Sequence, residues 1–287
     1  MSQKNKRRLK WGFLIFISCW IIFAQSCMKF RISDADAQQE FSARGVSISF
    51  HYADGNNTGL HYTKTGTDTL ATLFFVHGSP GGWDAFKQYM MDTDLLAQFR
   101  IISVDRPGFG YSDFGNAYHL KDQGPMIYKV IQLENNGKPV HLIGHSIGGP
   151  VIVELAQHYP AEVSSLTILA GSISPKDEPK EYWRYLFMYT PLRLLMPGAF
   201  KPSNDEIIYF KKELNRLDTG YAALQMPVTF IHGDKDKFVT VKNVAYGKSK
   251  LLHNSNIKVI IIPGAGHFIP WQQYNIIKTQ LLSLSKK

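Results

Sequence analysis

Apolar residues in this chain gather in short continuous runs, and longer stretches with helical spacing lie between the runs. The runs occupy residues 73–76, 101–104, 140–143, 165–169, 228–231 and 259–262. A short continuous apolar run is typical of a strand covered on both faces. The stretches between them predict helices over residues 83–99, 118–133, 149–159 and 271–284. Strands that alternate with helices indicate an α/β fold, with a mostly parallel sheet and helices on both faces.

Two segments depart from this alternation. Residues 46–50 and 60–62 alternate between apolar and polar side chains, with a turn-like sequence over residues 54–57, which predicts an antiparallel hairpin at a sheet edge. Residues 172–226 contain many aromatic side chains and several prolines but no strand-like run. We therefore expect a helical cap inserted at about residues 172–226, above the sheet edge where open α/β sheets bind ligands.

The N-terminal residues have the layout of an export signal. A basic start precedes an apolar stretch over residues 11–23, and small or uncharged residues then lead to Cys27. Residues 1–27 are predicted to be a signal peptide or a membrane anchor, followed by a polar tether or short helix over residues 28–45. The sequence before Cys27 resembles a bacterial lipoprotein signal, which would make Cys27 the lipidated first residue; an uncleaved anchor is the alternative. Either way we expect an exported, membrane-associated protein on the periplasmic side of the cell envelope.

The charge and the cysteine content limit which partners, disulfides and metal sites this protein can have. The formal net charge is +9, but five of the 32 basic residues precede the apolar stretch, which leaves 27 against 23 acidic residues. That balance gives little support to a nucleic-acid partner. The two cysteines, Cys19 and Cys27, both lie in the N-terminal segment. The remaining domain therefore has neither a disulfide framework nor a thiolate metal site, and we expect no metal.

The sequence Gly144-His145-Ser146-Ile147-Gly148 lies between a predicted strand and a predicted helix. A serine between two glycines at such a corner is the nucleophile-elbow pattern, in which a strained turn exposes the hydroxyl. The glycines leave room for the helix to pass the strand. We therefore identify Ser146 as the candidate nucleophile, and the N–H of Ile147 as one donor of an oxyanion hole.

A serine nucleophile needs a base, and the base needs a carboxylate that fixes its tautomer. His267 follows the strand at 259–262 and a loop rich in glycine, so we expect it to be the base. Asp234 and Asp236 both follow the strand at 228–231. Asp234 lies in the tight turn and is expected to cap it, whereas Asp236 lies where the chain has cleared the sheet edge. Asp236 is therefore the predicted acid.

Further site residues are predicted from their positions at strand ends. The Gly/Pro-rich turn over residues 77–82 is expected to supply the second oxyanion donor through the N–H of Ser79. His77, Gly78 and His145 are expected to support the pocket. In the cap, Trp183 and Phe187 are expected to line an apolar pocket above the nucleophile.

Taken together, these motifs resemble the α/β-hydrolase superfamily. They comprise residues 77–81, 105–112, the elbow at Ser146, residues 233–236 and Gly266-His267, in the order of that family. The resemblance covers residues 46–287 and implies an eight-stranded sheet, a Ser-Asp-His triad and a cap after the sixth strand. It assigns residues 105–112 a structural role near the pocket. No nucleotide, flavin or metal motif occurs in the sequence, so no cofactor is implied.

The expected function is that of a serine hydrolase that cleaves a carboxylic ester or thioester of a small molecule through an acyl-enzyme. Several alternatives remain. A peptidase or carbon–carbon bond hydrolase of the same superfamily fits the same motifs, although the oxyanion loop and Ile147 differ from those of proline iminopeptidases. A membrane-tethered ligand-binding protein on the same scaffold is a further alternative, because fold and function separate. Epoxide hydrolases and haloalkane dehalogenases carry an aspartate at the elbow, so Ser146 argues against both.

Overall fold

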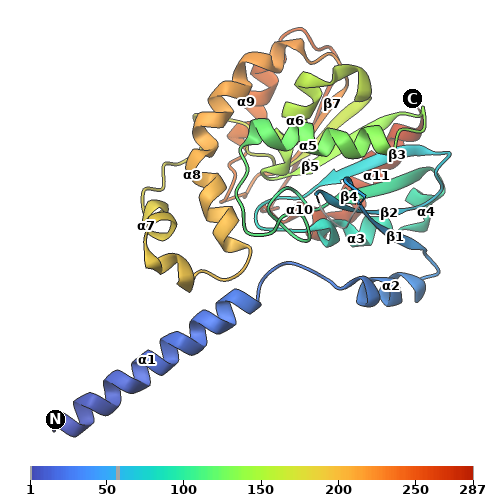
Figure 1. Cartoon of the computed structure of the whole chain (residues 1–287). Coiled ribbons are helices and arrows are strands. Elements are labelled where there is room, and N and C mark those ends of the chain that lie inside the picture. The colour runs from blue at the N-terminus through green and yellow to red at the C-terminus, as the bar shows by residue number, and fades with distance from the viewer. Residues whose placement is uncertain (1, 56–58, 287) are drawn as a thin grey trace.

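The apolar runs form one sheet of eight strands in the order β1-β2-β4-β3-β5-β6-β7-β8 (Figure 1). The computed structural model describes residues 2–55 and 59–286. Strands β3 to β8 are parallel, and β2 pairs antiparallel with β1 and β4. The strands are β1 (Ile48–Tyr52), β2 (His61–Thr65), β3 (Ala71–Val76), β4 (Phe99–Val104), β5 (Val140–His145), β6 (Ser165–Leu169), β7 (Val228–Gly233) and β8 (Ile257–Ile262). This is the predicted α/β-hydrolase architecture, and the mostly parallel sheet is confirmed.

Helices cover both faces of the sheet and bury two hydrophobic clusters against it. One cluster includes Ile127, Ile152 and Leu214 and lies under the helices α5, α6 and α8. The other includes Phe41, Phe86 and Ile277. The helices are α2 (Asp34–Ser42), α3 (Lys87–Met90), α4 (Thr93–Leu96), α5 (Leu120–Leu133), α6 (Gly148–His158), α7 (Arg184–Tyr189), α8 (Phe200–Leu217), α9 (Lys242–Lys250), α10 (Ile269–Gln272) and α11 (Tyr274–Leu282). Short 3-10 helices are η1 (Trp83–Phe86), η2 (Pro160–Glu162), η3 (Pro191–Leu195), η4 (Asp218–Ala223) and η5 (Ser283–Lys286).

Two predicted helices are broken in the structure. The stretch predicted over residues 83–99 forms η1, α3 and α4, and its last residue already begins β4. The break has a local cause, because the Asp92 carboxylate accepts the backbone N–H groups of Asp94 and Leu95 and starts a new helix. The stretch predicted over residues 271–284 is likewise divided into α10 and α11.

The hairpin predicted at the sheet edge is present as β1 and β2, which pair from Ile48 with Thr65 to Tyr52 with His61. Two residues of its predicted turn, Asn56 and Asn57, lie outside the described residues. Of the two alternatives for residues 28–45, the short helix is present as α2. Phe41 of α2 is fully buried, 6.1 Å from the ring of Trp83, so this helix packs on the folded domain.

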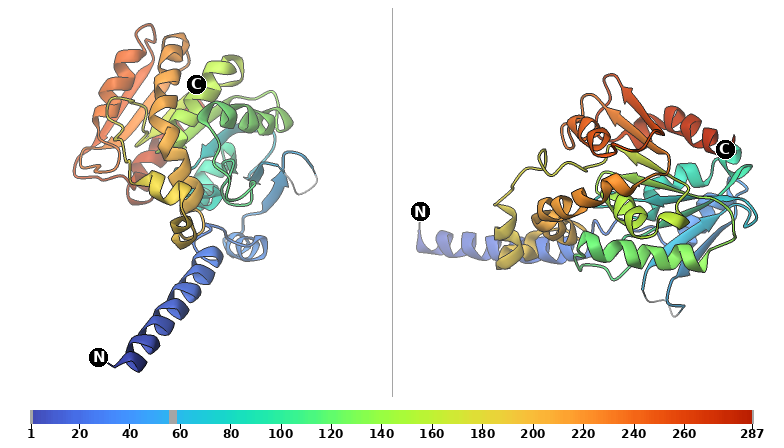
Figure 2. Two further views of the ribbon diagram at one scale, coloured as in Figure 1. Left: turned by 60° about the vertical axis from the view of Figure 1, so that its left-hand side comes forward. Right: turned by 90° about the horizontal axis from the view of Figure 1, so that it is seen from above.

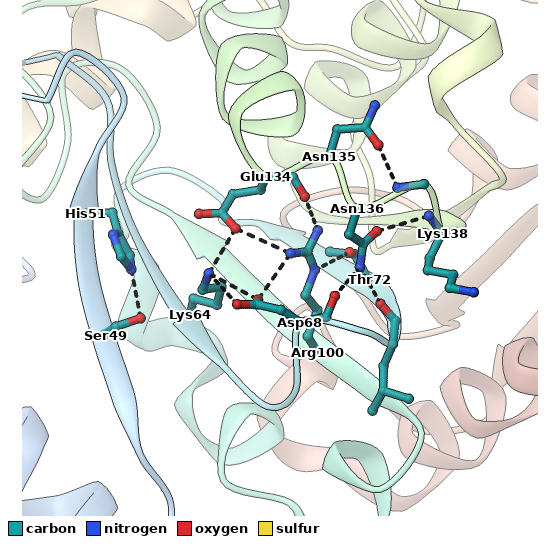
Figure 3. Close-up of polar contacts among 12 residues, drawn as sticks. Ser49, His51, Lys64, Asp68, Thr72, Arg100, Glu134, Asn135, Asn136 and Lys138 are labelled. Carbon is teal, nitrogen blue, oxygen red and sulfur yellow. Dashed lines mark hydrogen bonds and ion pairs between the residues drawn. The ribbon is translucent and has the colours of Figure 1, made fainter.

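A partly buried polar cluster ties the hairpin to the centre of the sheet (Figure 3). The guanidinium of Arg100 on β4 contacts the carboxylates of Asp68 and Glu134 and donates to the hydroxyl of Thr72. Lys64 on β2 contacts the same two carboxylates, at 3.1 and 3.0 Å. The cluster fixes the end of α5 against three strands, and it lies at the edge of the sheet where β3 and β4 begin.

The inserted segment between β6 and β7 contains α7, η3, α8 and η4 and covers one side of the domain (Figure 1). Helix α1 (Gln3–Ser26) projects away from the domain beside this cap (Figure 2). Its length and hydropathy would allow it to cross a membrane, and almost all of its side chains are exposed.

Candidate active site

Ser146 occupies a sharp corner between β5 and α6. Its φ of +55° lies in the left-handed region, which a side chain with a Cβ adopts only under strain. Its N–H donates to the carbonyl of Leu169 on the neighbouring strand, at 3.0 Å. The corner therefore holds the serine at the carboxyl end of the sheet and directly before the amino end of α6, where backbone N–H groups favour a negative charge.

The glycines on either side of Ser146 are required by close backbone approaches. A Cβ at Gly144 would stand 2.3 Å from the carbonyl oxygen of Gly148, and a Cβ at Gly148 would stand 2.3 Å from that of Val76. Both distances are far below any contact that a real Cβ makes. Any other residue would push α6 away from the sheet and shift Ser146 with it.

His267 and Asp236 come together from the loops after β8 and β7. The Nδ1 of His267 lies 2.7 Å from Oδ2 of Asp236, whose side chain is completely buried. The other carboxylate oxygen accepts the backbone N–H groups of Phe238 and Val239, at 2.9 and 2.8 Å. Burial alone would raise the pKa of Asp236, but hydrogen bonds from His232 and His267 hold it well below its ordinary value. A charged carboxylate therefore faces Nδ1 of His267 and keeps the proton on that nitrogen.

Asp234 makes a different contact from the one expected. Its Oδ1 accepts the N–H of Gly264 in the loop after β8, at 2.7 Å, rather than capping its own turn. Asp236 caps the following bend, through the N–H groups of Phe238 and Val239, and also contacts His267. Asp234 thus holds together the two loops that carry Asp236 and His267.

The loop over residues 77–82 lies directly against the serine. A Cβ at Gly78 would stand 3.0 Å from Cβ of Ser146 and 3.2 Å from Nδ1 of His145. The next residue, Ser79, has a buried hydroxyl with no hydrogen-bond partner among the described residues. The predicted oxyanion residues Ser79 and Ile147 therefore belong to the two backbone segments that meet at Ser146.

His77 supports this loop from beneath as a neutral imidazole. Its Nε2 accepts the backbone N–H of Arg106 at 2.9 Å, so the proton lies on Nδ1, which donates to the carbonyl of Gly78 at 2.6 Å. Complete burial and the nearby Arg106 guanidinium hold the pKa of His77 well below its ordinary value.

Arg106 is a buried residue of this site in the segment 105–112, which was expected to be only structural. Its guanidinium donates to the Gly78 carbonyl at 3.1 Å and pairs with both carboxylate oxygens of Glu206 at 2.9 Å each. The side chains of Arg106 and Glu206 are 0% and 4% exposed. Glu206 belongs to α8, so this pair joins the cap to the loop beside Ser146. The two residues lie 100 positions apart, and no local pattern relates them.

His145, also predicted at the pocket, supports His267. Its Nε2 donates to the carbonyl of His267 at 3.1 Å, and the two rings are 4.8 Å apart. Burial, together with the neighbouring His267, lowers the pKa of His145 to about 3, so it is neutral near pH 7. His145 therefore acts as a fixed donor.

Three exposed aromatic side chains lie beside His267 and His145, and none of them was predicted to belong to the site. Phe238 and Phe268 lie 5.5 and 5.8 Å from the His267 ring, and Trp271 lies 5.3 Å from the His145 ring. All three are more than 40% exposed. Exposed apolar rings beside the histidine favour an apolar ligand at this position. The pattern Phe-Ile-Pro-Trp after His267 is the feature of the sequence that could have pointed to two of them.

The cap residues predicted to line the pocket lie on or next to α7. The rings of Trp183 and Phe187 pack edge to face, 6.0 Å apart, and Trp183 is 52% exposed. A groove of about 400 Å³ between the start of the cap and α8 has other lining residues, among them Tyr182, Tyr185, Ile207, Ile208, Lys211 and Lys212. Among the described residues, no three histidine, cysteine, aspartate or glutamate side chains gather as a metal-binding group.

Several known proteins are similar to this chain. It is 33% identical over 124 residues to a 2-hydroxy-6-oxononadienedioate/2-hydroxy-6-oxononatrienedioate hydrolase of Burkholderia vietnamiensis, an alignment that covers 41% of this chain and 42% of the relative. The match thus spans about two fifths of the length of that curated relative.

Solved structures with the same fold cover much more of the chain. A membrane phospholipase A, described as a bacterial virulence factor, has a TM-score of 0.61 and 16% identity, with 99% of both chains covered. A monoacylglycerol lipase of Paleococcus ferrophilus has a TM-score of 0.63 and 16% identity, with 79% of this chain and 99% of that chain covered. At such identities the likeness concerns the fold alone.

The model of the α/β-hydrolase fold family matches residues 71–219. That match covers more than half of the 287 residues and includes Ser146, the loop at residues 77–82 and most of the cap. The chain belongs to the α/β-hydrolase fold family.

Proposed function

We propose that this protein is a serine hydrolase that cleaves a carboxylic ester or thioester through an acyl-enzyme. Ser146 is the nucleophile, His267 the base and Asp236 the acid that orients it. The backbone N–H groups of Ser79 and Ile147 form the oxyanion hole. The observation that carries this proposal is the 2.7 Å contact between His267 Nδ1 and a buried Asp236 carboxylate, in the same site as a strained serine at a helix amino end.

The proposed reaction has two halves. Ser146 Oγ attacks the carbonyl carbon while its proton passes to Nε2 of His267, and the carbonyl oxygen becomes an oxyanion held by the two N–H groups. The intermediate collapses, the bond to the leaving alcohol or thiol breaks, and His267 returns the proton to that group. Water then attacks the acyl carbon with His267 again as base, which releases the acid and restores the serine hydroxyl.

The electrostatics of the site support these roles. With the Asp236 carboxylate accepting Nδ1–H, the proton-free nitrogen of a neutral His267 is Nε2, which a general base requires. The same carboxylate stabilises the imidazolium that forms during the attack. The exposed rings of Phe238, Phe268 and Trp271 favour a substrate with an apolar acyl or alcohol group.

Turnover of short p-nitrophenyl esters by the purified full chain tests the proposal. We expect Ser146→Ala to reduce turnover by about 10⁴–10⁶-fold. Ser174→Ala is the matched control, because Ser174 is also buried but bonds only to Asp177 and Asn243. Equal turnover by wild type and Ser146→Ala would reject the assignment, and binding of esters without turnover would favour a ligand-binding protein.

A carbon–carbon bond hydrolase is the second candidate function. The similarity to the Burkholderia vietnamiensis hydrolase over two fifths of the chain supports it. Cleavage of a 2-hydroxy-6-oxodienoate with no turnover of esters or thioesters would establish it in place of the ester reaction.

We also propose that α1 is a retained membrane anchor, with the catalytic domain outside the cytoplasm. The basic residues before Trp11 favour a cytoplasmic N-terminus. Ala24 of α1 is fully buried, and its carbonyl accepts the N–H of Gly198 in the cap at 2.8 Å, a contact that cleavage before Cys27 would remove. Mass spectrometry of the membrane-extracted protein tests this. An intact N-terminus supports the anchor, whereas a chain that begins at a diacylated Cys27, and is lost in Cys27→Ser, supports lipidation.

A further inference from the structure

The cap segment from Tyr182 to Leu195 exposes an unusual number of large side chains. We call their surface the cap face; it comprises Tyr182, Trp183, Tyr185, Leu186, Tyr189, Leu192 and Leu194. Its charged residues are Arg184 and Arg193. Arg184 pairs with Glu181 at 2.6 Å and Arg193 pairs with Asp205. The cap face therefore carries no unbalanced charge, and aromatic and leucine side chains dominate it.

The cap face is fastened to the C-terminal half of α1. The indole Nε1 of Trp20 donates to the carbonyl of Leu195 at 3.0 Å, and the Gln25 amide donates to that of Leu194 at 2.9 Å. Both carbonyls belong to η3, which contacts α1, and Figure 2 shows the cap segment close to this end of the helix. The segment and the C-terminal half of the helix are therefore held side by side.

These hydrogen bonds fix the depth of the cap relative to α1. Trp20 lies four residues before Ala24, near the end of the apolar stretch that starts at Trp11. At 1.5 Å per residue, Trp20 is about 6 Å below Ala24 along the helix axis. The apolar stretch over residues 11–23 is about 20 Å long at that rise, less than the hydrocarbon thickness of about 30 Å, so Trp20 lies below the lipid boundary when the stretch crosses a bilayer. The Leu195 carbonyl bonds to the indole of Trp20 and therefore lies within one side-chain length of that depth. The cap cannot then stay in water.

We infer that the cap face is a membrane-contacting surface that inserts into the lipid boundary of the bilayer crossed by α1. The inference rests on the proposed anchor. Tyrosine and tryptophan favour this boundary because their rings are apolar and their polar ends remain hydrated. The expected depth of about 6 Å lies within the range of surface-inserted segments. The occupant of the cap face is thus the lipid itself.

Fluorescent labelling of single cysteines tests the inference on the full chain. In a Cys19→Ser, Cys27→Ser background, Leu194→Cys carries the probe on the cap face and Phe16→Cys carries it in α1. Leu252→Cys is the matched control, since Leu252 is an exposed leucine after α9 and outside the cap. Each protein is reconstituted in phosphatidylcholine vesicles whose acyl chains carry a nitroxide quencher, at a shallow position for the Leu194 and Leu252 probes and at a deep position for the Phe16 probe.

We expect the nitroxide to quench the Leu194 probe by about twofold or more and to leave the Leu252 probe unchanged. A Leu194 probe that behaves like the Leu252 probe, while the Phe16 probe is quenched, overturns the cap face and leaves the anchor standing. Absence of quenching at Phe16 overturns the anchor and the cap face together.

A second inference rests on the peptide unit between Gly78 and Ser79. The carbonyl of Gly78 accepts from His77 Nδ1 and from the Arg106 guanidinium. Because the peptide unit is planar, fixing this carbonyl also fixes the direction of the N–H of Ser79. Arg106 is in turn held by both carboxylate oxygens of Glu206 on α8.

We propose that Arg106 and Glu206 are positioning residues that aim the Ser79 N–H at the oxyanion. This role rests on the proposed oxyanion hole. Neither side chain needs to touch the substrate. The contribution appears only when charge develops on the carbonyl oxygen, so loss of the pair lowers kcat more than it raises KM.

The test compares Glu206→Gln with Asp205→Asn, which breaks the neighbouring cap ion pair with Arg193 and leaves the Gly78 loop untouched. We expect Glu206→Gln to lower kcat by about 10–100-fold with little change in KM. An alkyl boronic acid forms a tetrahedral adduct with the serine, and we expect the same variant to bind it more weakly by a similar factor. Asp205→Asn should change neither.

Should Glu206→Gln fail to fold, Arg106→Lys is measured in the same way. This variant keeps the positive charge but loses the paired geometry with Glu206. Equal kcat and boronate affinity in the Glu206 and Asp205 variants overturns the positioning role, whereas a wild type without esterase activity overturns the proposed function instead.

Discussion

Replacing Asp236 with asparagine should invert the tautomer of His267. Oδ1 of Asp236 accepts two backbone N–H groups, from Phe238 and Val239, so only an oxygen can occupy that position. The amide nitrogen of the variant must then take the place of Oδ2, 2.7 Å from Nδ1 of His267. An N–H cannot face another N–H, so Nδ1 loses its proton and Nε2 gains one.

The size of the effect follows from that inversion. A His267 with its proton on Nε2 cannot accept the proton of Ser146, so turnover should fall by about 10⁴-fold. That factor corresponds to a barrier higher by about 5 kcal/mol, at 1.36 kcal/mol for each tenfold change. The two backbone hydrogen bonds to the side-chain oxygen persist, so the fold should remain intact.

Steady-state hydrolysis of a p-nitrophenyl ester measures the loss, and circular dichroism checks the fold. Asp234→Asn is the control, because its amide oxygen can still accept the N–H of Gly264 and should cost no more than about 1 kcal/mol of stability. Full activity in Asp236→Asn, with a large loss in Asp234→Asn, would refute the assignment of the acid.

Three further predictions concern other parts of the molecule. Glu134→Ala should lower the free energy of unfolding by about 1–3 kcal/mol in urea titrations, because buried Arg100 loses one of its two carboxylate partners and keeps only Asp68, while kcat at the distant site stays unchanged. Gly78→Ala should lower kcat by about 10–100-fold with a small change in Tm, since its Cβ would press on Ser146. The lowered pKa of Asp236 stabilises the fold above its unfolded pKa, and this contribution is lost as pH falls towards the folded pKa. The stability difference between wild type and Asp236→Asn should therefore be constant above about pH 5 and shrink steadily below it, with some of it still present at about pH 3.

Most of the sheet could be predicted from the sequence because its strands are continuous apolar runs. All six runs form strands, from β3 to β8, and the alternating hairpin forms β1 and β2. The helices on either side were harder to delimit. Asp92 interrupts one of them through side-chain capping, and α9 was not predicted because its sequence from Lys242 to Lys250 has few apolar residues.

The residues of the candidate site likewise fall into two groups, those that local sequence patterns could predict and those that they could not. Ser146, Asp236 and His267 each follow a strand and could be picked out from local spacing, and the structure brings the last two into contact. The Arg106–Glu206 pair and the aromatic rings around His267 could not be identified in this way. They arise from tertiary contacts between segments that are distant in the chain, such as the loop after β4 and the cap helix α8.

The nucleophile itself can be tested by covalent labelling. The full chain is treated with an alkyl fluorophosphonate, digested, and analysed by mass spectrometry for the modified peptide. We expect one phosphonate on Ser146, formed in wild type and absent from Ser146→Ala, with labelling slowed in Asp236→Asn. Equal labelling of wild type and Ser146→Ala, or an adduct on another serine, would contradict the assignment of Ser146 as the catalytic nucleophile.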